Sequence, residues 1–249
     1  MLKTSVKNIY DILNSLAPFD SAEEYDNVGL LVGDLEQEVS KILVVLDVTH
    51  QAIEKAVNIG AQLIISHHPL MFSPIRNITT ASYEGDLIIK LIQHRISLIA
   101  AHTNADKTFL SGSAAVAEKL KLENIYQTED PYIFIGTLTK EMTGKELNTL
   151  LEKLFNNKVI LHGNENKKIR RLAIAGGAYS EGFVSAKKAE ADAYLTGEIK
   201  HHHILEATAY DLVLFQGGHF ETEYPMIEKL ARCLQKELNQ LQSKAEVYS

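Results

Sequence analysis

The sequence predicts an α/β protein made of two intertwined, pseudo-symmetric halves with largely parallel sheets. Short apolar runs without alternation, such as 42–46 and 63–65, are separated by an amphipathic stretch. This pattern is typical of strands that are buried on both faces of a parallel sheet and joined by helices. A shift of 130 positions lays 42–66 on 172–196, and a chance resemblance between two such units is the alternative explanation. We expect a single unit over 1–249, with approximate halves 1–125 and 126–249.

The composition is that of an ordinary globular protein. The 249 residues are 45% hydrophobic and carry a net charge of −7, and this charge argues against a general nucleic-acid partner, which would favour a basic face. Cys233 is the only cysteine, so neither a disulfide framework nor a cysteine-based zinc site is expected. No apolar run reaches the roughly 20 residues that span a bilayer. Charges at Lys3, Lys7 and Asp11 interrupt any signal-peptide pattern, so we expect a cytoplasmic protein without a membrane partner.

Local signals place the elements of the first half. Ser5 or Thr4 can cap a first helix, which Pro18 ends. Asp26 and Asn27 stand where a loop enters a strand, and the simplest interpretation of the pair is an Asx turn. The strand–helix–strand pattern at 42–65 predicts a right-handed βαβ unit. The expected helices cover 4–16, 49–56, 86–93 and 114–120, and the expected strands lie in 28–32, 42–46, 63–65 and 97–101.

The second half follows an irregular polar segment at 121–132, which we interpret as the internal boundary. Thr143 and Glu146 form a capping-box pattern that opens a helix. The other expected helices cover 182–190, 204–209 and 226–241, and the expected strands lie in 132–138, 159–161, 171–175, 193–196, 212–215 and near Val247.

Residues that can bind metal ions follow the ends of four of these strands. Because ligands of open parallel sheets collect at the carboxyl ends of strands, the sequence predicts a shared metal site between the two halves. A lone histidine at a strand end is more often a hydrogen-bonded structural residue, but four such ends favour a metal site. The candidate metal ligands are His67, His68, Asp106, His219 and Glu223, with Glu198 and His102 beside them as candidates for proton transfer.

The adjacency of His67 and His68 favours two ions rather than one, because neighbouring side chains leave an extended backbone in different directions. Glu223 can bridge two metals, and Gly217-Gly218 together with Pro225 argue for a loop around it. Imidazoles and carboxylates suit two divalent ions per subunit, either zinc, iron, manganese or cobalt. Their excess positive charge favours a bound hydroxide or an anionic substrate.

Two further segments have competing interpretations. The turn Ala175-Gly176-Gly177-Ala178-Tyr179-Ser180 precedes a helix, so its amides could hold a phosphate, although a plain tight turn explains it better. The run Lys200-His201-His202-His203 is internal. We expect it to open a helix on the rim of a cavity, with contact to a substrate as the less favoured alternative.

Five motifs resemble the NIF-three-like family of dinuclear metal centre proteins, also known as GTP cyclohydrolase 1 type 2 homologs. They are Tyr25-Asp26-Asn27-Val28-Gly29-Leu30, Ser66-His67-His68-Pro69-Leu70, Ala101-His102-Thr103-Asn104-Ala105-Asp106, Thr196-Gly197-Glu198-Ile199-Lys200-His201-His202 and Gly218-His219-Phe220-Glu221-Thr222-Glu223. The resemblance runs nearly end to end and implies the same five metal ligands. It also implies a toroidal homohexamer, a ring whose sites face an inner cavity. Tyr25 stands where many members have Trp, and the chain lacks the large inserted domain of longer members.

Two functions compete on this basis. The resemblance implies a metal-dependent hydrolase acting on a nucleotide or another phosphate-containing small molecule, with GTP cyclohydrolase-like attack of water on carbon 8 of guanine and release of formate. Glu198 or His102 would then transfer the proton. The alternative is a non-catalytic metal-binding regulator, metal carrier or protein-interaction ring, so whether the chain is an enzyme stays open at this point.

Overall fold

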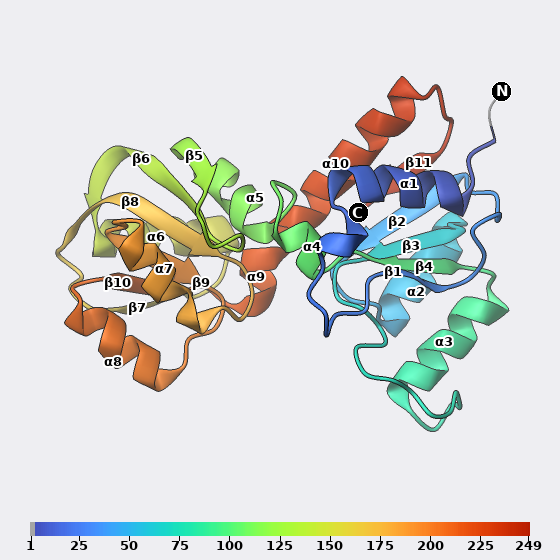
Figure 1. The fold of residues 1–249 in the computed structure, drawn as a ribbon, viewed down its shortest axis with the longest axis horizontal. Coiled ribbons are helices and arrows are strands. Elements are labelled where there is room, and N and C mark those ends of the chain that lie inside the picture. Colours follow the sequence, from blue (N-terminus) through green and yellow to red (C-terminus); the bar gives the residue numbers. More distant parts are fainter. Residues whose placement is uncertain (1–2) are drawn as a thin grey trace. The chain divides into compact units, whose positions relative to one another are not determined.

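The computed structural model describes residues 3–249 and divides them into two compact units (Figure 1). The first unit contains the chain up to Lys107 together with Ile227–Ser249, and the second contains Thr108–Met226. This division differs from the halves expected at 125 and 126. The C-terminal segment returns to the first unit, where its last strand pairs with a strand near the start of the chain.

The first unit contains a five-stranded sheet in the order β1-β4-β3-β2-β11. Three of its four pairings are parallel, and only β1 runs antiparallel to its neighbour β4. The strands are β1 (Gly29–Val32), β2 (Lys41–Val45), β3 (Leu63–Ser66), β4 (Ser97–Ala100) and β11 (Glu246–Tyr248). The α/β class and the parallel βαβ unit expected for this part of the chain are therefore confirmed.

Helices cover both faces of the first sheet, as its uninterrupted apolar strands require. Leu43, Ile64 and Leu98 pack with apolar side chains of α2 and α3 on one face. Alternate strand residues such as Ile42 and Ile65 are also fully buried, and Figure 1 shows α1 and α10 on the side opposite α2 and α3. The helices are α1 (Val6–Leu16), α2 (His50–Ile59), α3 (Tyr83–Gln93), the short α4 (Thr103–Asp106) and α10 (Pro225–Gln240), with a 3₁₀ turn at Phe19–Ser21.

The second unit contains a six-stranded mixed sheet in the order β5-β6-β8-β9-β10-β7. Only β8–β9 and β9–β10 pair in parallel, while the other three pairings are antiparallel. Its strands are β5 (Glu123–Gln127), β6 (Phe134–Thr143), β7 (Ile160–His162), β8 (Lys168–Ala175), β9 (Ala193–Thr196) and β10 (Val213–Gln216). The segment at 121–132, expected to be irregular, thus contains the edge strand β5.

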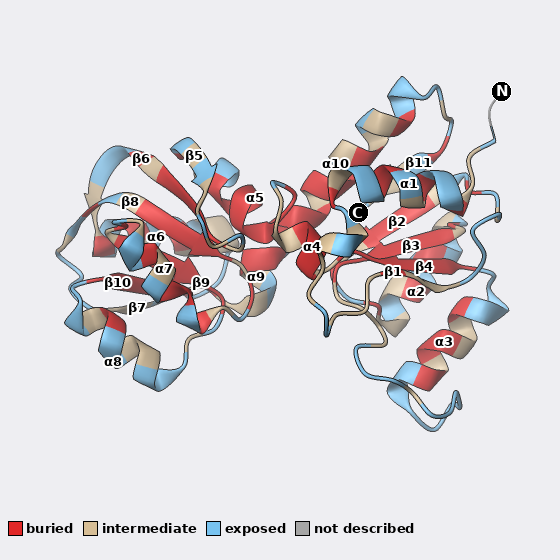
Figure 2. Cartoon of the chain, in the orientation of Figure 1, coloured by how far each residue is buried: buried red, intermediate tan, exposed pale blue. Residues whose placement is uncertain are grey.

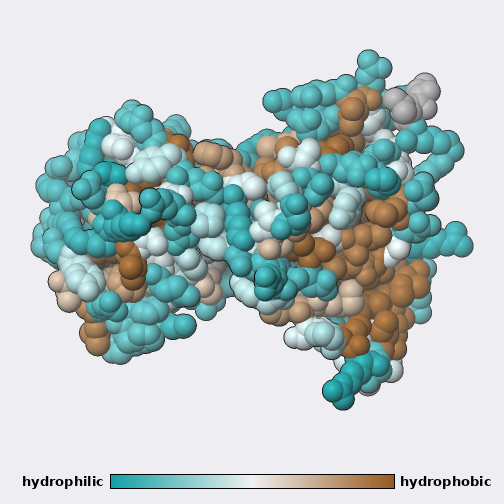
Figure 3. Space-filling model, viewed as in Figure 1, coloured by the Kyte–Doolittle hydropathy of each residue, from teal (hydrophilic) through white to brown (hydrophobic). Residues whose placement is uncertain are grey.

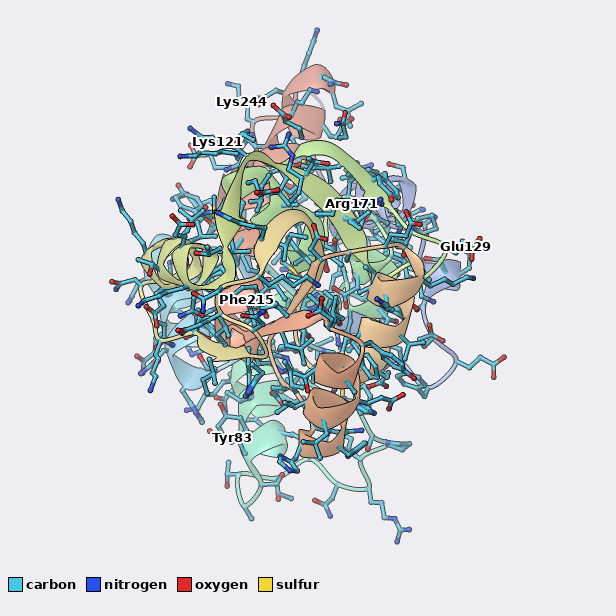
Figure 4. The ribbon with its side chains drawn as sticks, turned by 90° about the vertical axis from the view of Figure 1, so that its left-hand side faces the viewer. Tyr83, Lys121, Glu129, Arg171, Phe215 and Lys244 are labelled. Carbon is cyan, nitrogen blue, oxygen red and sulfur yellow. The ribbon has the colours of Figure 1, made fainter. Side chains whose placement is uncertain are left out.

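Apolar side chains on both faces of this second sheet form two buried clusters, and its central strands are coloured as buried in Figure 2. Phe215 and Leu195 pack with Leu147 and Val116, which come from α6 and α5, and Phe215 lies inside the unit in Figure 4. On the other face, Tyr194 packs with side chains from α7 and α8. The helices are α5 (Gly112–Lys119), α6 (Gly144–Phe155), α7 (Phe183–Lys188), α8 (His201–Ala209) and α9 (His219–Glu223), with a 3₁₀ turn at Ser180–Gly182.

The strand registers support the expected internal repeat. In the first unit Ile42 pairs with Leu63, and in the second Leu172 pairs with Ala193, so the shift of 130 relates both strands and their register. The third strand of each set, β4 or β10, is followed at once by a short helix, α4 or α9. Each unit therefore presents the carboxyl ends of three adjacent parallel strands at one edge of its sheet.

Capping residues fix several helix ends where the sequence predicted them. Ser5 and Thr143 accept hydrogen bonds from the backbone of their own first turns, each as part of a capping box. Gly60 ends α2 in a left-handed conformation with φ of +71°. Within residues 3–249, no helix is long and apolar enough to cross a membrane.

Candidate metal centre

In the first unit, the end of β3 places His67 beside Asp106 of α4. His67 is completely buried, and its Nδ1 lies 2.9 Å from the carbonyl oxygen of Ala101. Because a carbonyl only accepts, Nδ1 carries the proton and Nε2 carries the lone pair. This Nε2 atom lies 3.6 Å from Asp106 Oδ1. The short helix α4 thus brings a carboxylate to the nitrogen that can bind a metal.

His68 and His102 are oriented in the same way, each by an aspartate. His68 Nδ1 lies 2.8 Å from Asp47 Oδ1, and His102 Nδ1 lies 2.9 Å from Asp26 Oδ1. An ionised carboxylate only accepts, so both rings carry their proton on Nδ1 and present Nε2 as the basic nitrogen. This carboxylate–histidine arrangement is the usual support of a metal-binding imidazole.

Asp26 does more than form the expected turn. Its side chain is fully buried, and besides His102 it accepts hydrogen bonds from the backbone amide and the hydroxyl of Thr103. Burial alone would raise the pKa of Asp26, but the hydrogen bonds from His102 and Thr103 outweigh it and hold the pKa well below the ordinary value. Asp26 is therefore ionised at neutral pH, and as an anion it fixes His102.

The three imidazoles of this unit form one cluster. The ring centroids of His67 and His68 are 5.0 Å apart, and His102 lies 5.0 Å from the first and 5.6 Å from the second. One nitrogen from each ring lies within 4.8 Å of the other two. The rings of His67 and His68 are tilted by 46°, yet one nitrogen of each lies within 4.8 Å of the other. The adjacent pair therefore converges, and our expectation that the two side chains point in different directions was wrong.

In the second unit, the end of β10 places His219 and Glu223 together. His219 Nε2 lies 3.1 Å from Glu223 Oε2, and its Nδ1 lies 2.8 Å from Glu198 Oε1. Our expectation that 219–223 is a loop was wrong, because this segment is the helix α9. Gly218, with φ of +90°, turns the chain just before the helix, and Pro225 opens the next helix, α10, at a position that favours proline.

Gly177 makes room for this pair of donors. A Cβ atom at Gly177 would lie 2.1 Å from Glu223 Oε1 and 3.5 Å from His219 Nε2, and its φ of +66° is unfavourable for other residues. The amide of Gly177 donates to the Thr222 hydroxyl, and its carbonyl accepts from the amides of Gly197 and Glu198. The Gly-Gly turn therefore packs against α9 and holds the end of β9.

The same contacts decide between the two interpretations of the turn at 175–180. The amide of Gly176 donates to the Ser113 hydroxyl, so both glycine amides are bonded within the unit. This favours the tight turn over a phosphate-binding loop.

The run Lys200–His203 opens α8, as expected, with Lys200 as its N-cap. Lys200 also lines a cavity of about 440 Å³ beside Glu198 and Gln216.

Each unit contains two donor atoms at the separation that a shared ion requires. Ligand atoms about 2.1 Å from a tetrahedral zinc ion are about 3.4 Å from one another. The separations of 3.6 Å for His67 with Asp106 and 3.1 Å for His219 with Glu223 bracket this value. The donors therefore fit divalent metal ions, and the histidine tautomers leave the required nitrogens basic.

Sequence reasoning missed the orienting role of two aspartates. Asp47 directly follows the expected strand at 42–46, which is parallel to the strand that leads into His68. Its place at the end of a parallel strand next to the one that leads into His68 was a sequence signal that Asp47 could orient this histidine. Asp26 was interpreted only as a turn residue. The pairing of Asp26 with His102 joins positions 76 residues apart, so no local pattern reveals it.

Comparison with known proteins shows which family this chain resembles. A model of the family described as Duf34/NIF3 (NGG1p interacting factor 3) matches residues 4–249. A Clostridium perfringens protein named GTP cyclohydrolase 1 type 2 homolog is 35% identical over 242 residues, which cover 94% of this chain and 92% of the relative. A Helicobacter pylori protein named GTP cyclohydrolase 1 type 2 is 33% identical, with 88% of this chain and 86% of the relative covered.

A solved structure agrees with the fold. The crystal structure of the Staphylococcus aureus hypothetical protein SA1388 superposes with a TM-score of 0.94 at 28% sequence identity, covering 99% of this chain and 96% of that one. The family suggested by the five sequence motifs is thus confirmed by the family model and by the relatives, and the solved structure shows the same fold.

Proposed function

The chain belongs to the Duf34/NIF3 family, and from that premise we propose that it is a dinuclear metal-dependent hydrolase acting on a nucleotide-like substrate. One observation carries the proposal. All four histidines at the two sheet edges donate Nδ1–H to an oxygen, three of them to carboxylates. Purely structural histidines have no need of a common tautomer, whereas metal ligands and a proton-accepting base all need a free Nε2.

We propose two ions, bound by His67, His68, Asp106, His219 and Glu223. The two donor pairs, one in each unit, have the spacing of ligands on one ion, and this spacing supports one ion for each pair. Their nitrogen and oxygen donors suit zinc, iron, manganese or cobalt. Divalent ions of this kind lower the pKa of bound water and polarise the group that is attacked.

The residues next to these donors receive distinct roles. His102 is fixed by Asp26 and stands against His67 and His68, so it is placed to accept and return a proton. Glu198 bonds to Nδ1 of His219, so in our proposal it acts mainly by holding that ring. Direct proton transfer by Glu198 stays a prediction, and its side chain is exposed enough to meet a substrate.

The test combines metal analysis with a hydrolysis screen. Purified protein is analysed by inductively coupled plasma mass spectrometry and assayed on GTP, other nucleotides and simple phosphoesters. We expect bound divalent metal, and activity that is lost in His67→Ala and Glu223→Ala while the fold is retained. His94→Ala, an exposed histidine outside the donor set, is the matched control. Metal-replete protein that is inert on every substrate would favour the alternative of a non-catalytic regulator or interaction ring.

We also propose that the chain assembles into a homohexameric ring. Exposed hydrophobic side chains, which suit an interface, gather over β1 and α3 (Figure 3). Ile92 of α3 is 58% exposed. Light scattering after size exclusion should give six times the 27.8 kDa of one chain. A monomer at micromolar concentration would refute the ring without touching the metal centre.

A further inference from the structure

Two large aromatic side chains stand exposed beside the imidazole cluster of the first unit. Tyr25 is 66% exposed and Phe72 is 50% exposed. Their ring centroids are 6.2 Å apart with the planes at 56°, and Phe72 lies 6.3 Å from His102. Neither hydrolysis nor metal binding, as proposed above, uses these two rings.

The residues that follow Tyr25 anchor the chain segments next to both rings. Asn27 donates its side-chain N–H to the carbonyl of Met71, at 2.6 Å, and so ties down the loop that carries Phe72. Asp26 holds His102 and Thr103. The motif Tyr25-Asp26-Asn27 therefore connects three parts of the unit, and an Asx turn alone would require none of these long-range contacts.

Exposed rings on a fixed support have a definite chemical use. An aromatic face in water attracts another flat ring, because stacking removes apolar surface from water and aligns the two π-systems. Stacking on nucleobases is tolerant of sequence because every base has a π-face, and its loss weakens binding by about tenfold or more per base. The planes of Tyr25 and Phe72 are tilted by 56°, and Phe72 is nearly perpendicular to His102. A planar ligand can therefore stack on one exposed ring and meet the other at an angle, as aromatic pairs also do.

We propose that Tyr25 and Phe72 form a stacking platform that holds the planar heteroaromatic ring of the substrate against the imidazole cluster. This inference rests on the proposed function for the identity of the reaction, but the platform itself is a binding site that can be tested without turnover. Tyr25 and Phe72 are positioning residues for the ring, and Phe72 lies 6.3 Å from His102 of the cluster.

The experiment measures the binding of guanosine, with ribose 5-phosphate as the ring-free comparison, by isothermal titration calorimetry. It uses the metal-loaded protein first and the chelator-treated protein second. We expect guanosine to bind both forms, and Tyr25→Leu and Phe72→Leu each to weaken guanosine by about tenfold. Ribose 5-phosphate should bind these variants as it binds the unaltered protein. Tyr25→Trp, which enlarges the ring face, should retain or tighten guanosine binding.

Tyr83→Leu provides the matched control. Tyr83 is 58% exposed at the start of α3 (Figure 4), so its loss should leave guanosine binding unchanged. Circular dichroism and metal content show whether each variant is folded and loaded. The platform is refuted if unaltered protein does not bind guanosine, or if Tyr25→Leu and Phe72→Leu bind it normally. Neither result would contradict the proposed hydrolase, which is tested by metal content and turnover. Conversely, a protein without hydrolase activity could still bind guanosine at the platform.

Discussion

The two units present donors at the same edge of related sheets but hold them by different means. The first unit offers three imidazoles and one carboxylate, and aspartates from other strands and loops fix two of the rings. The second offers one imidazole and Glu223, which is nearly buried against a glycine turn. One strand plan can thus supply nitrogen donors by hydrogen bonding and a carboxylate by close packing.

The largest expected effect comes from removing one imidazole from either unit. His67→Ala and His219→Ala should each weaken binding of one ion by more than about a hundredfold, because loss of a ligand exceeds the effect of losing its support. Metal content per chain should fall from two to one in both variants. A complete loss of metal in both would show a single shared ion and break the comparison of two donor pairs.

Asp26→Asn should cost about 1.5–3 kcal/mol of unfolding free energy at pH 7, since it removes charged hydrogen bonds from a buried site. The folded pKa of Asp26 is lowered, so its stabilisation is complete above the unfolded pKa of about 4 and is lost as pH falls below it. The difference in unfolding free energy between the unaltered protein and Asp26→Asn should therefore shrink as the pH falls from neutral to acidic values. Urea unfolding of the chelator-treated proteins measures this difference. A difference in unfolding free energy that does not depend on pH would contradict this account.

Substitutions of the orienting carboxylates compare the two units directly. Asp47→Asn in the first and Glu198→Gln in the second should each weaken metal binding by about tenfold to a hundredfold. Asp86→Asn is the control, because Asp86 bonds to His50, a histidine outside the donor set. If Glu198→Gln lowers the hydrolysis rate with unchanged metal affinity, then Glu198 transfers protons rather than holding His219.

The smallest expected effect comes from replacing a glycine at positive φ by alanine. Two such substitutions distinguish backbone strain from packing against Glu223. Gly60→Ala and Gly177→Ala both place a side chain at positive φ, at a cost of about 1 kcal/mol. At Gly60 no described heavy atom lies within 4 Å of the new Cβ, whereas at Gly177 Glu223 lies in its way. Chemical denaturation should show similar losses, and metal titration should show weaker binding only in Gly177→Ala. Equal metal binding in both variants would mean that Glu223 adapts.

The short helix α9 shows where local reasoning failed. Glycines and a proline around 219–223 suggested a loop, but Gly218 only turns the chain into the helix and Pro225 begins the next one. The i, i+4 spacing of His219 and Glu223 was the better signal. Local breakers mark boundaries, and they do not decide what lies between two boundaries.

The sequence by itself determined the α/β class, the repeated βαβ plan and the residues at the strand ends, because apolar runs and donor residues are local and periodic. Tertiary structure alone decided that the C-terminal strand joins the first sheet and that the second sheet is mixed. It also decided that Asp26 holds His102 and that Gly177 packs against Glu223. These contacts join residues tens of positions apart, and hydrogen bonding and close packing between such segments leave no periodic trace in the chain.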